Sequence, residues 1–222
     1  MPRRQRRIQL GALILPSWIP DDHPLHLNPD IQRRIRRDFD PRGIFLNIPY
    51  SRGYSSLEIA IISTVTAYDM TPHMARERTR MEIRLQRIVE LLLSCRYALT
   101  DLSYARRMNM PLELGLLLAF GKETFIMTRQ RYHALKTVSD LNFGDIYDHG
   151  GSVRALIVGL SRWIEQNCSR KRLTTKTLLE RYGRLRKIRE KLGDDFDRLA
   201  PQDIVKLLGV ARDEFNMLLS GR

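Results

Sequence analysis

Residues 96–122, RYALTDLSYARRMNMPLELGLLLAFGK, contain the pattern that decides the fold: a short strand, a polar turn and an apolar helix. The strand is mostly apolar and ends at Asp101. Pro111 then opens a second apolar segment, residues 111–120, in which Glu113 is the one charged side chain. Because a helix without a polar face is typical of a protein interior, we expect residues 111–120 to form a buried helix.

Glu113 is predicted to lie at the start of that helix, next to the end of the preceding strand. Burying a carboxylate there without a partner costs free energy or raises its pKa, and such a placement suits a catalytic group. A structural role is the alternative. With Met110 as the N-cap and Pro111 as the first helical residue, Glu113 falls at the third position, where acidic residues stabilise a helix start. The local pattern leaves both interpretations open.

Strands and amphipathic helices alternate on both sides of this stretch. The sequence predicts strands at residues 44–48, 71–75, 96–101, 124–127 and 141–146. It predicts helices at residues 31–39, 56–68, 84–94, 111–120, 130–138 and 153–167. Such alternation implies right-handed crossovers and a parallel sheet. We therefore expect an α/β fold of the flavodoxin-like (Rossmannoid) type, with four or five parallel strands flanked by helices and a C-terminal helical appendage.

In this fold the ligand crevice lies outside the carboxyl ends of the first and third strands. The sequence places two polar segments there, residues 47–54 and residues 100–103. A helix N-terminus preceded by such a loop favours anionic ligands. The candidate substrate-binding residues are Asn47, Pro49, Tyr50, Ser51, Tyr54, Asp101, Ser103 and Asn109. Asp145, Asp148 and His149 are further candidates for the same crevice, and a polar turn before the next helix is the simpler interpretation of each.

The chain divides into three predicted regions: a basic, proline-rich arm (residues 1–42), an α/β domain (residues 43–168) and a basic helical region (residues 169–222). The net charge of +13 is concentrated near the two ends, and residues 169–192 contain ten basic and two acidic side chains. This distribution fits either a polyanionic partner, such as nucleic acid or an acidic protein surface, or a merely solvated face. The candidate partner-binding residues are Arg181, Arg184, Arg186, Lys187 and Arg189.

Other features limit the location and chemistry of the protein. Residues 203–219 resemble a helix-turn-helix, for which packing against the body is the alternative to DNA binding. No run of 18 apolar residues occurs, so we expect no membrane span. Residues 1–15 lack the pattern of a secretory signal. The two cysteines, Cys95 and Cys168, are far apart in sequence, which predicts free thiols, no bound metal and a cytoplasmic, reducing location.

The residues of the opening stretch also resemble a known family. Asp101, Leu102, Ser103, Asn109, Glu113, Leu114, Gly115, Gly121 and Lys122 look like the DL(S/T)…N…ELG…A.GK signature of the TIR-like and nucleoside 2-deoxyribosyltransferase-like superfamily. The resemblance covers residues 43–167 and is specific in its core. It implies that Glu113 attacks or stabilises C1 of a ribose whose N-glycosidic bond is broken. It further implies that Asp101 or Asn109 holds ribose hydroxyls and that residues 47–54 hold phosphate and base.

Two functions follow. The resemblance implies a nucleotide N-glycosidase, or a deoxyribosyltransferase-like enzyme, with NAD or another nucleotide as substrate and no cofactor. Such domains serve as toxic effectors of bacterial antiviral defence, controlled by oligomer formation or by a protein or nucleic-acid partner. The alternative is a non-catalytic nucleotide- or nucleic-acid-binding subunit with a TIR-like core and basic tails. Two features favour this alternative: the basic tails, and Arg107, which stands where deoxyribosyltransferases carry Asp.

Overall fold

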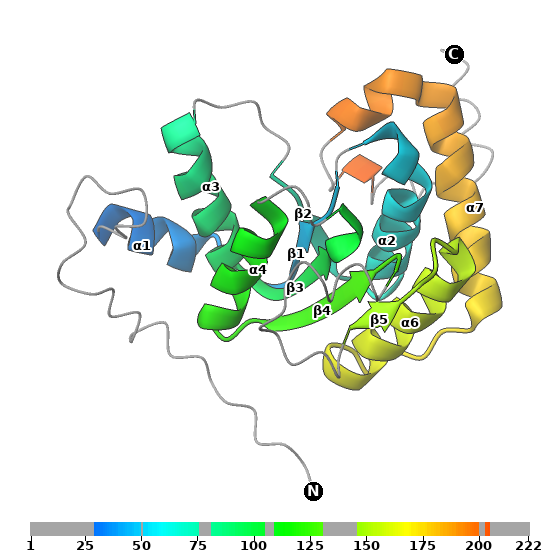
Figure 1. Cartoon of the computed structure of the whole chain (residues 1–222), viewed down its shortest axis with the longest axis horizontal. Helices are drawn as coiled ribbons and strands as arrows, with labels where there is room; N and C mark the ends of the chain where they lie inside the picture. Colours follow the sequence, from blue (N-terminus) through cyan, green and yellow to red (C-terminus); the bar gives the residue numbers. More distant parts are fainter. Residues whose placement is uncertain are drawn as a thin grey trace, which may run out of the picture.

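The computed structural model describes residues 29–49, 51–75, 81–104, 109–130, 146–199 and 203–204. Its centre is a five-stranded sheet in the order β2-β1-β3-β4-β5, in which every neighbouring pair of strands is parallel (Figure 1). The strands are β1 (Asp40–Asn47), β2 (Thr71–His73), β3 (Cys95–Asp101), β4 (Glu123–Thr128) and β5 (Tyr147–Asp148). The predicted flavodoxin-like α/β fold is confirmed.

Helices cover both faces of the sheet (Figure 1). One layer contains α2 (Ser55–Ala67), α6 (Val153–Asn167) and α7 (Thr175–Leu192), and the other contains α1 (Pro29–Arg37), α3 (Met81–Ser94) and α4 (Asn109–Ala119). Short 3₁₀ turns follow three elements: η2 (Arg52–Tyr54), η3 (Leu102–Tyr104) and η5 (Gly193–Arg198). In β1, Ile44 and Leu46 join the core beneath α2, whereas Phe45 joins the core beneath α3. The continuous apolar strand is thus buried on both sides, as expected for a parallel sheet.

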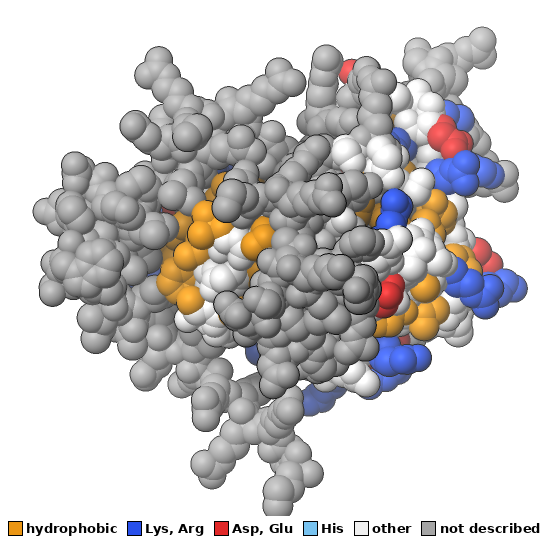
Figure 2. Space-filling model, viewed as in Figure 1, with side chains coloured by type: hydrophobic (Ala, Val, Ile, Leu, Met, Phe, Trp, Pro, Cys, Tyr) orange, Lys and Arg blue, Asp and Glu red, His pale blue; other side chains and the backbone are white. Residues whose placement is uncertain are grey.

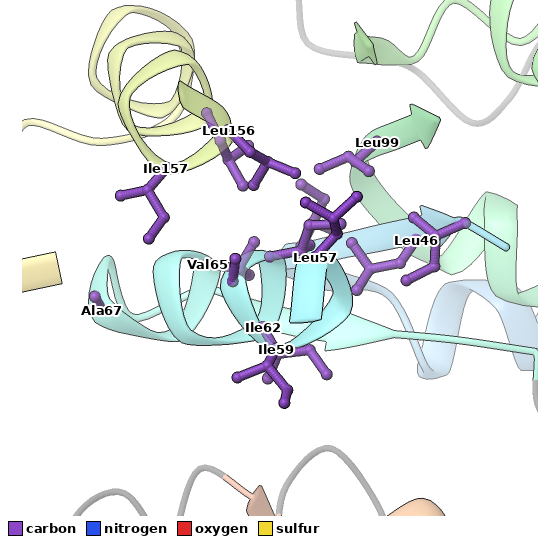
Figure 3. Close-up of a cluster of buried hydrophobic side chains, with 14 of the residues drawn as sticks. Leu46, Leu57, Ile59, Ile62, Val65, Ala67, Leu99, Leu156 and Ile157 are labelled. Atoms are coloured by element: carbon purple, nitrogen blue, oxygen red, sulfur yellow. The ribbon is translucent and has the colours of Figure 1, made fainter. Parts of the chain in front are cut away.

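The helix α2 is the most deeply buried helix of the described chain, because it lies between the sheet and two other helices. Every residue from 57 to 67 is buried. Figure 3 shows Leu57 and Val65 of α2 beside Leu156 of α6 and the strand residue Leu46. The buried hydroxyl groups of Ser63, Thr64 and Thr66 donate to carbonyl oxygens of the helix itself, so their burial leaves no hydroxyl of these three residues without a partner.

The predicted strands and helices that fall on described residues are found close to their expected positions. The structure describes a fifth strand at Tyr147–Asp148. Of the strand predicted at residues 141–146, all but Ile146 lies outside the described residues. Ile146 packs in a small cluster with Leu102 and Leu114. The strand begins after it because Tyr147 and Asp148 pair with the end of β4. The predicted helix at residues 130–138 lies, apart from Gln130, outside the described residues.

The helix α4 is not buried on all sides, and this part of the prediction is also wrong. It buries one side through Met110, Leu114 and Leu117. Leu112 and Leu118 are 57% and 40% exposed. A helix that covers one face of a sheet buries only the positions spaced three and four apart, whatever residues occupy its outer side. Because nearly all residues of α4 are apolar, their types alone could not predict which side of the helix packs against the sheet.

The basic helix α7 is part of the same layered body as the sheet. Its Leu178, Leu185 and Ile188 are buried in the apolar cluster that contains the core residues of α2 and α6. Ile204 is buried in this cluster as well. The rest of the predicted helix-turn-helix, and the arm up to residue 28, lie outside the described residues. Within the described ranges, no helix combines the length and the apolar character needed to cross a membrane.

A largely buried ion pair connects α7 to α2. Nη1 of Arg189 lies 3.7 Å from Oε2 of Glu58, which is 5% exposed, and the Arg189 guanidinium also stacks over the ring of Phe196. Removing one partner of such a pair leaves the other charge buried without compensation, which lowers the free energy of unfolding. Replacing both partners by apolar residues of similar size usually costs much less.

We expect Arg189→Met to lower the free energy of unfolding by about 2 kcal/mol, less than for a fully buried pair because Arg189 keeps some exposure. Urea denaturation measures this difference. The matched control is Arg186→Met, which removes an exposed pair with Glu190 on the same helix and should change stability by at most about 0.5 kcal/mol. Equal losses in the two variants would contradict a stabilising role for the Glu58 pair.

Both cysteines are free thiols, as the sequence predicts. Burial raises the pKa of the Cys95 thiol to about 12 and also raises the pKa of the Cys168 thiol. In an unfolded chain the pKa of a cysteine thiol is about 8.5. The folded state therefore keeps two protons that the unfolded state has already lost, and this difference destabilises the fold at alkaline pH.

The contribution of the thiols is fully present below about pH 8.5 and is lost as the pH rises toward the folded-state pKa values. Between about pH 9 and pH 11, we expect stability to fall more steeply in the wild type than in Cys95→Ala/Cys168→Ala. The difference in slope should be up to about 1.4 kcal/mol per pH unit for each thiol. Urea titrations across this range measure both slopes, and parallel pH profiles would contradict the prediction.

Candidate functional site

The polar segments predicted to form the site meet at the carboxyl edge of the sheet. The strand order reverses between β1 and β3, and in such folds ligands bind outside the carboxyl ends of these strands. Asn47 ends β1 and pairs with Thr100, the residue before Asp101. The buried Asn47 side chain donates through Nδ2 to the carbonyl oxygen of Met110 at 2.9 Å. This bond fixes the start of α4 against the end of β1, so Asn47 positions α4.

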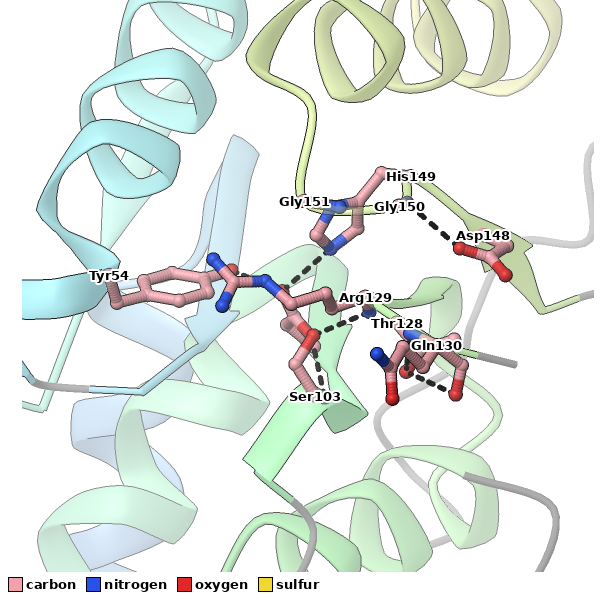
Figure 4. A network of polar contacts seen from close by, with 10 residues as sticks. Tyr54, Ser103, Thr128, Arg129, Gln130, Asp148, His149, Gly150 and Gly151 are labelled. Atoms are coloured by element: carbon pink, nitrogen blue, oxygen red, sulfur yellow. Dashed lines mark hydrogen bonds and ion pairs between the residues drawn. The ribbon is translucent and has the colours of Figure 1, made fainter. Parts of the chain in front are cut away.

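Asp101, at the end of β3, is the centre of a buried hydrogen-bond network. Figure 4 labels its partners Tyr54, Ser103 and His149. The Asp101 side chain is fully buried, and its two oxygens accept hydrogen bonds from three residues. The backbone N–H of Ser103 donates to Oδ1 at 2.7 Å, and the Ser103 hydroxyl donates to the same oxygen. The Tyr54 hydroxyl donates to Oδ2, and His149 Nε2 lies 3.3 Å from that oxygen. These four contacts fix the carboxylate in one orientation.

The tautomer of the His149 ring follows from the hydrogen bonds of its two nitrogens. Its Nδ1 accepts the backbone N–H of Gly151 at 3.1 Å, so the ring proton lies on Nε2, which donates to Asp101. The turn that allows this contact needs glycine, because Gly150 and Gly151 have φ angles of 57° and 78°. The backbone N–H of His149 also donates to the carbonyl oxygen of Thr128, which attaches the turn to β4.

Arg129 follows β4 directly and adds a cation to this edge. Its backbone N–H donates to the Ser103 hydroxyl oxygen at 2.6 Å. Figure 4 shows its side chain extending from the end of β4 toward Tyr54, beside Gly151. A Cβ atom at Gly151 would come within 3.0 Å of Arg129 Nε, so glycine makes room for the guanidinium. Arg129 has no carboxylate partner in the part of the chain that the structure describes, and its buried Nε has no hydrogen-bond acceptor there.

Glu113 lies farther into its helix than the sequence suggested. The helix α4 begins at Asn109, which makes Glu113 its fifth residue, and the first turn contains no acidic side chain. The prediction that Glu113 occupies the third position, as in a capping box, is therefore wrong. Its side chain is half-buried, just before the buried Leu114. Glu113 thus lies on the helix that the Asn47 amide attaches to the ligand edge.

The remaining predicted residues differ in their placement. Tyr54 and Ser103 belong to the Asp101 network. Pro49 is buried, and Ser51 is half-buried with its carbonyl oxygen accepting the Tyr54 backbone N–H. Asp148 is exposed and accepts the backbone N–H of Gly150. Tyr50, Asp145 and the side chain of Asn109 lie outside the described residues.

One member of the site, Arg129, was not identified from the sequence. His149 was a candidate for the crevice, with a polar turn as the simpler interpretation, and its contact with Asp101 was not predicted. A usable signal existed for Arg129, because it follows the predicted strand 124–127 and the carboxyl ends of parallel strands meet at one edge. No comparable local signal exists for the contact of His149 with Asp101, which are 48 residues apart.

The site has no assignment from other proteins. No family model, curated protein or solved structure matches the chain. The resemblance to the TIR-like and deoxyribosyltransferase-like superfamily thus rests on the motif of this sequence alone. Within the described ranges, no three His, Cys, Asp or Glu side chains are grouped so as to hold a metal ion.

Proposed function

We propose that the carboxyl edge of the sheet binds a nucleotide and that the protein cleaves its N-glycosidic bond, with Glu113 as the catalytic carboxylate. The observation that supports this proposal is the contrast between two carboxylates at one edge. Asp101 is fully buried and held by Tyr54, Ser103 and His149, so it cannot contact a substrate without disrupting them. Glu113 is only half-buried and belongs to the helix attached to this edge.

The proposed chemistry requires a carboxylate beside C1 of the ribose. When the bond between C1 of the ribose and the base nitrogen breaks, the electron pair leaves with the base and positive charge develops at C1. A carboxylate beside C1 offsets that charge, or captures C1 as an ester, in a site that excludes water. A water molecule then adds its oxygen to C1 and loses a proton. An anionic purine or pyrimidine takes up this proton, whereas the nicotinamide of NAD leaves as a neutral base and the proton goes to solvent. The products are the free base and a ribose, a ribose phosphate or, from NAD, ADP-ribose.

Arg129 and Asp101 have supporting roles in this proposal. The Arg129 guanidinium, without a carboxylate partner among the described residues, would bind a phosphate of the nucleotide. Asp101 would act as a positioning residue that holds Tyr54 and His149 around it, in place of the ribose contact that the family resemblance implies. The family resemblance remains an independent reason to expect ribose chemistry.

The test is a release assay with the full chain. Purified protein is incubated with NAD and with a panel of nucleosides and nucleotides, and the free base is separated by chromatography. Because the family resemblance implies control by a partner, growth of a bacterial host expressing the chain provides a second readout. Release of one base, or host toxicity accompanied by loss of cellular NAD or nucleotide, supports the proposal. Absence of all of these effects contradicts it.

The second candidate is a subunit that binds a nucleotide without cleaving it. The saturation of Asp101 by protein donors favours this reading, because it leaves Glu113 as the single proposed catalytic group. Calorimetric titration with the same panel distinguishes the two functions. Binding without base release, unaffected by Glu113→Gln, would establish the binding subunit.

A further inference from the structure

The basic residues of α7 fall into two groups according to their surroundings. Arg189 is directed toward Glu58 and Phe196, and Arg181 is half-buried, so that burial lowers its pKa. Arg186 forms an ion pair with Glu190. Of the five predicted partner-binding residues, Arg186 and Arg189 are thus paired within the protein and Arg181 is partly covered by it. The structure leaves Arg184 and Lys187 on the solvent side.

These two residues belong to a longer row, here called the basic stripe: Lys176, Arg184, Lys187 and Lys191. Their spacings of eight, three and four residues place them on one side of α7, within roughly 80° of its circumference. All four are exposed, and none has a carboxylate partner in the described chain. At about 1.5 Å of rise per residue the stripe is about 22 Å long. Glu180 is the acidic residue on the same side.

The surroundings of the stripe identify its chemical partner. Figure 2 shows Lys and Arg side chains along the border of the molecule where α7 lies. Within the described ranges, the large exposed apolar side chains are Leu112 and Leu118, which belong to α4 in the other layer of helices. A protein partner usually requires an apolar centre in its interface. Contacts to phosphate groups require only lysine and arginine.

We propose that the basic stripe binds the phosphate backbone of nucleic acid without reading its bases. About 22 Å of duplex presents about six phosphates per strand, enough for each of the four side chains to contact one. Contacts to phosphate groups carry no sequence information, so binding through the backbone should be independent of sequence. This surface is separate from Glu113, and the proposal does not depend on the proposed N-glycosidase activity.

Fluorescence anisotropy with the full chain and a labelled 20-base-pair duplex of arbitrary sequence tests the proposal. We expect log Kd to depend on log salt concentration with a slope of about 3 to 4, because each phosphate contact contributes about 0.9. Arg184→Gln/Lys187→Gln should lower this slope by about 2 and weaken binding at least about tenfold at low salt. A duplex of unrelated sequence should bind with the same affinity.

The matched control is Arg36→Gln/Arg186→Gln, which removes two exposed positive charges away from the stripe. It should retain nearly the wild-type slope. Equal losses in both double variants would show that net charge alone causes binding, and would overturn the proposal. Absence of binding by the wild type at about 50 mM salt, or tighter binding of polyglutamate than of the duplex, would overturn it as well. The melting temperature of each variant verifies that it is folded.

Discussion

Replacing Glu113 with glutamine should lower the rate of base release from the nucleotide substrate by at least about 100-fold. The substitution retains the size of the side chain and removes the charge that would offset the cation at C1. Binding should change by no more than a fewfold, because the charge at C1 develops only as the bond breaks. Stability should change by less than about 1 kcal/mol, since the side chain is half-buried and outside the first helical turn.

The matched control is Glu123→Gln, which makes the same chemical change at an exposed residue that begins β4, at the opposite edge of the sheet. Base release should be unaffected in this variant. Chromatography of the released base gives the rates, and thermal melting verifies the fold. If Glu113→Gln retains full activity, or if it simply unfolds, then Glu113 is structural and the nucleotide-binding subunit becomes the better proposal.

The fold could be predicted because its determinants are local. The apolar run in β1 and the helical periodicity of α6 and α7 each lie within a single element. The strand β5 was not predicted at Tyr147 and Asp148, because these two residues are strand only through pairing with Met127 and Thr128, which no local pattern reveals. The start of α4 was placed two residues late. Proline fits any position of the first turn, where the backbone N–H has no helical partner, so Pro111 did not mark the first residue.

The candidate site could be predicted only in part. The end of β3 and the segment before α2 were identified because the topology rule places polar residues there. The network itself depends on contacts between Tyr54, Asp101 and His149, which come from three separate elements. The sequence also did not show that Arg184 and Lys187 are the basic residues of α7 that remain exposed. Helix periodicity predicts the buried side of a helix, but it does not predict which arginines form ion pairs. Burial and pairing are properties of the folded chain.

The second large effect is expected on stability. Asp101→Asn should lower the free energy of unfolding by about 4 kcal/mol, as judged from the cost of leaving buried polar groups without partners. The asparagine oxygen can still accept from Ser103, but its NH₂ group would then face His149. Because His149 accepts from Gly151 through Nδ1, its Nε2 is a fixed donor, and two donors would meet in a fully buried place.

Tyr54→Phe provides the comparison, because it removes one donor and leaves the carboxylate with Ser103 and His149. We expect it to cost about 1 to 2 kcal/mol. Urea denaturation of both single variants and of the double variant gives the coupling energy, which should exceed about 0.5 kcal/mol for residues in one network. If Asp101→Asn is as stable as the wild type, the carboxylate is not the centre of the network. Asp101 would then be available to a ligand, and the division of roles between Asp101 and Glu113 would have to be reversed.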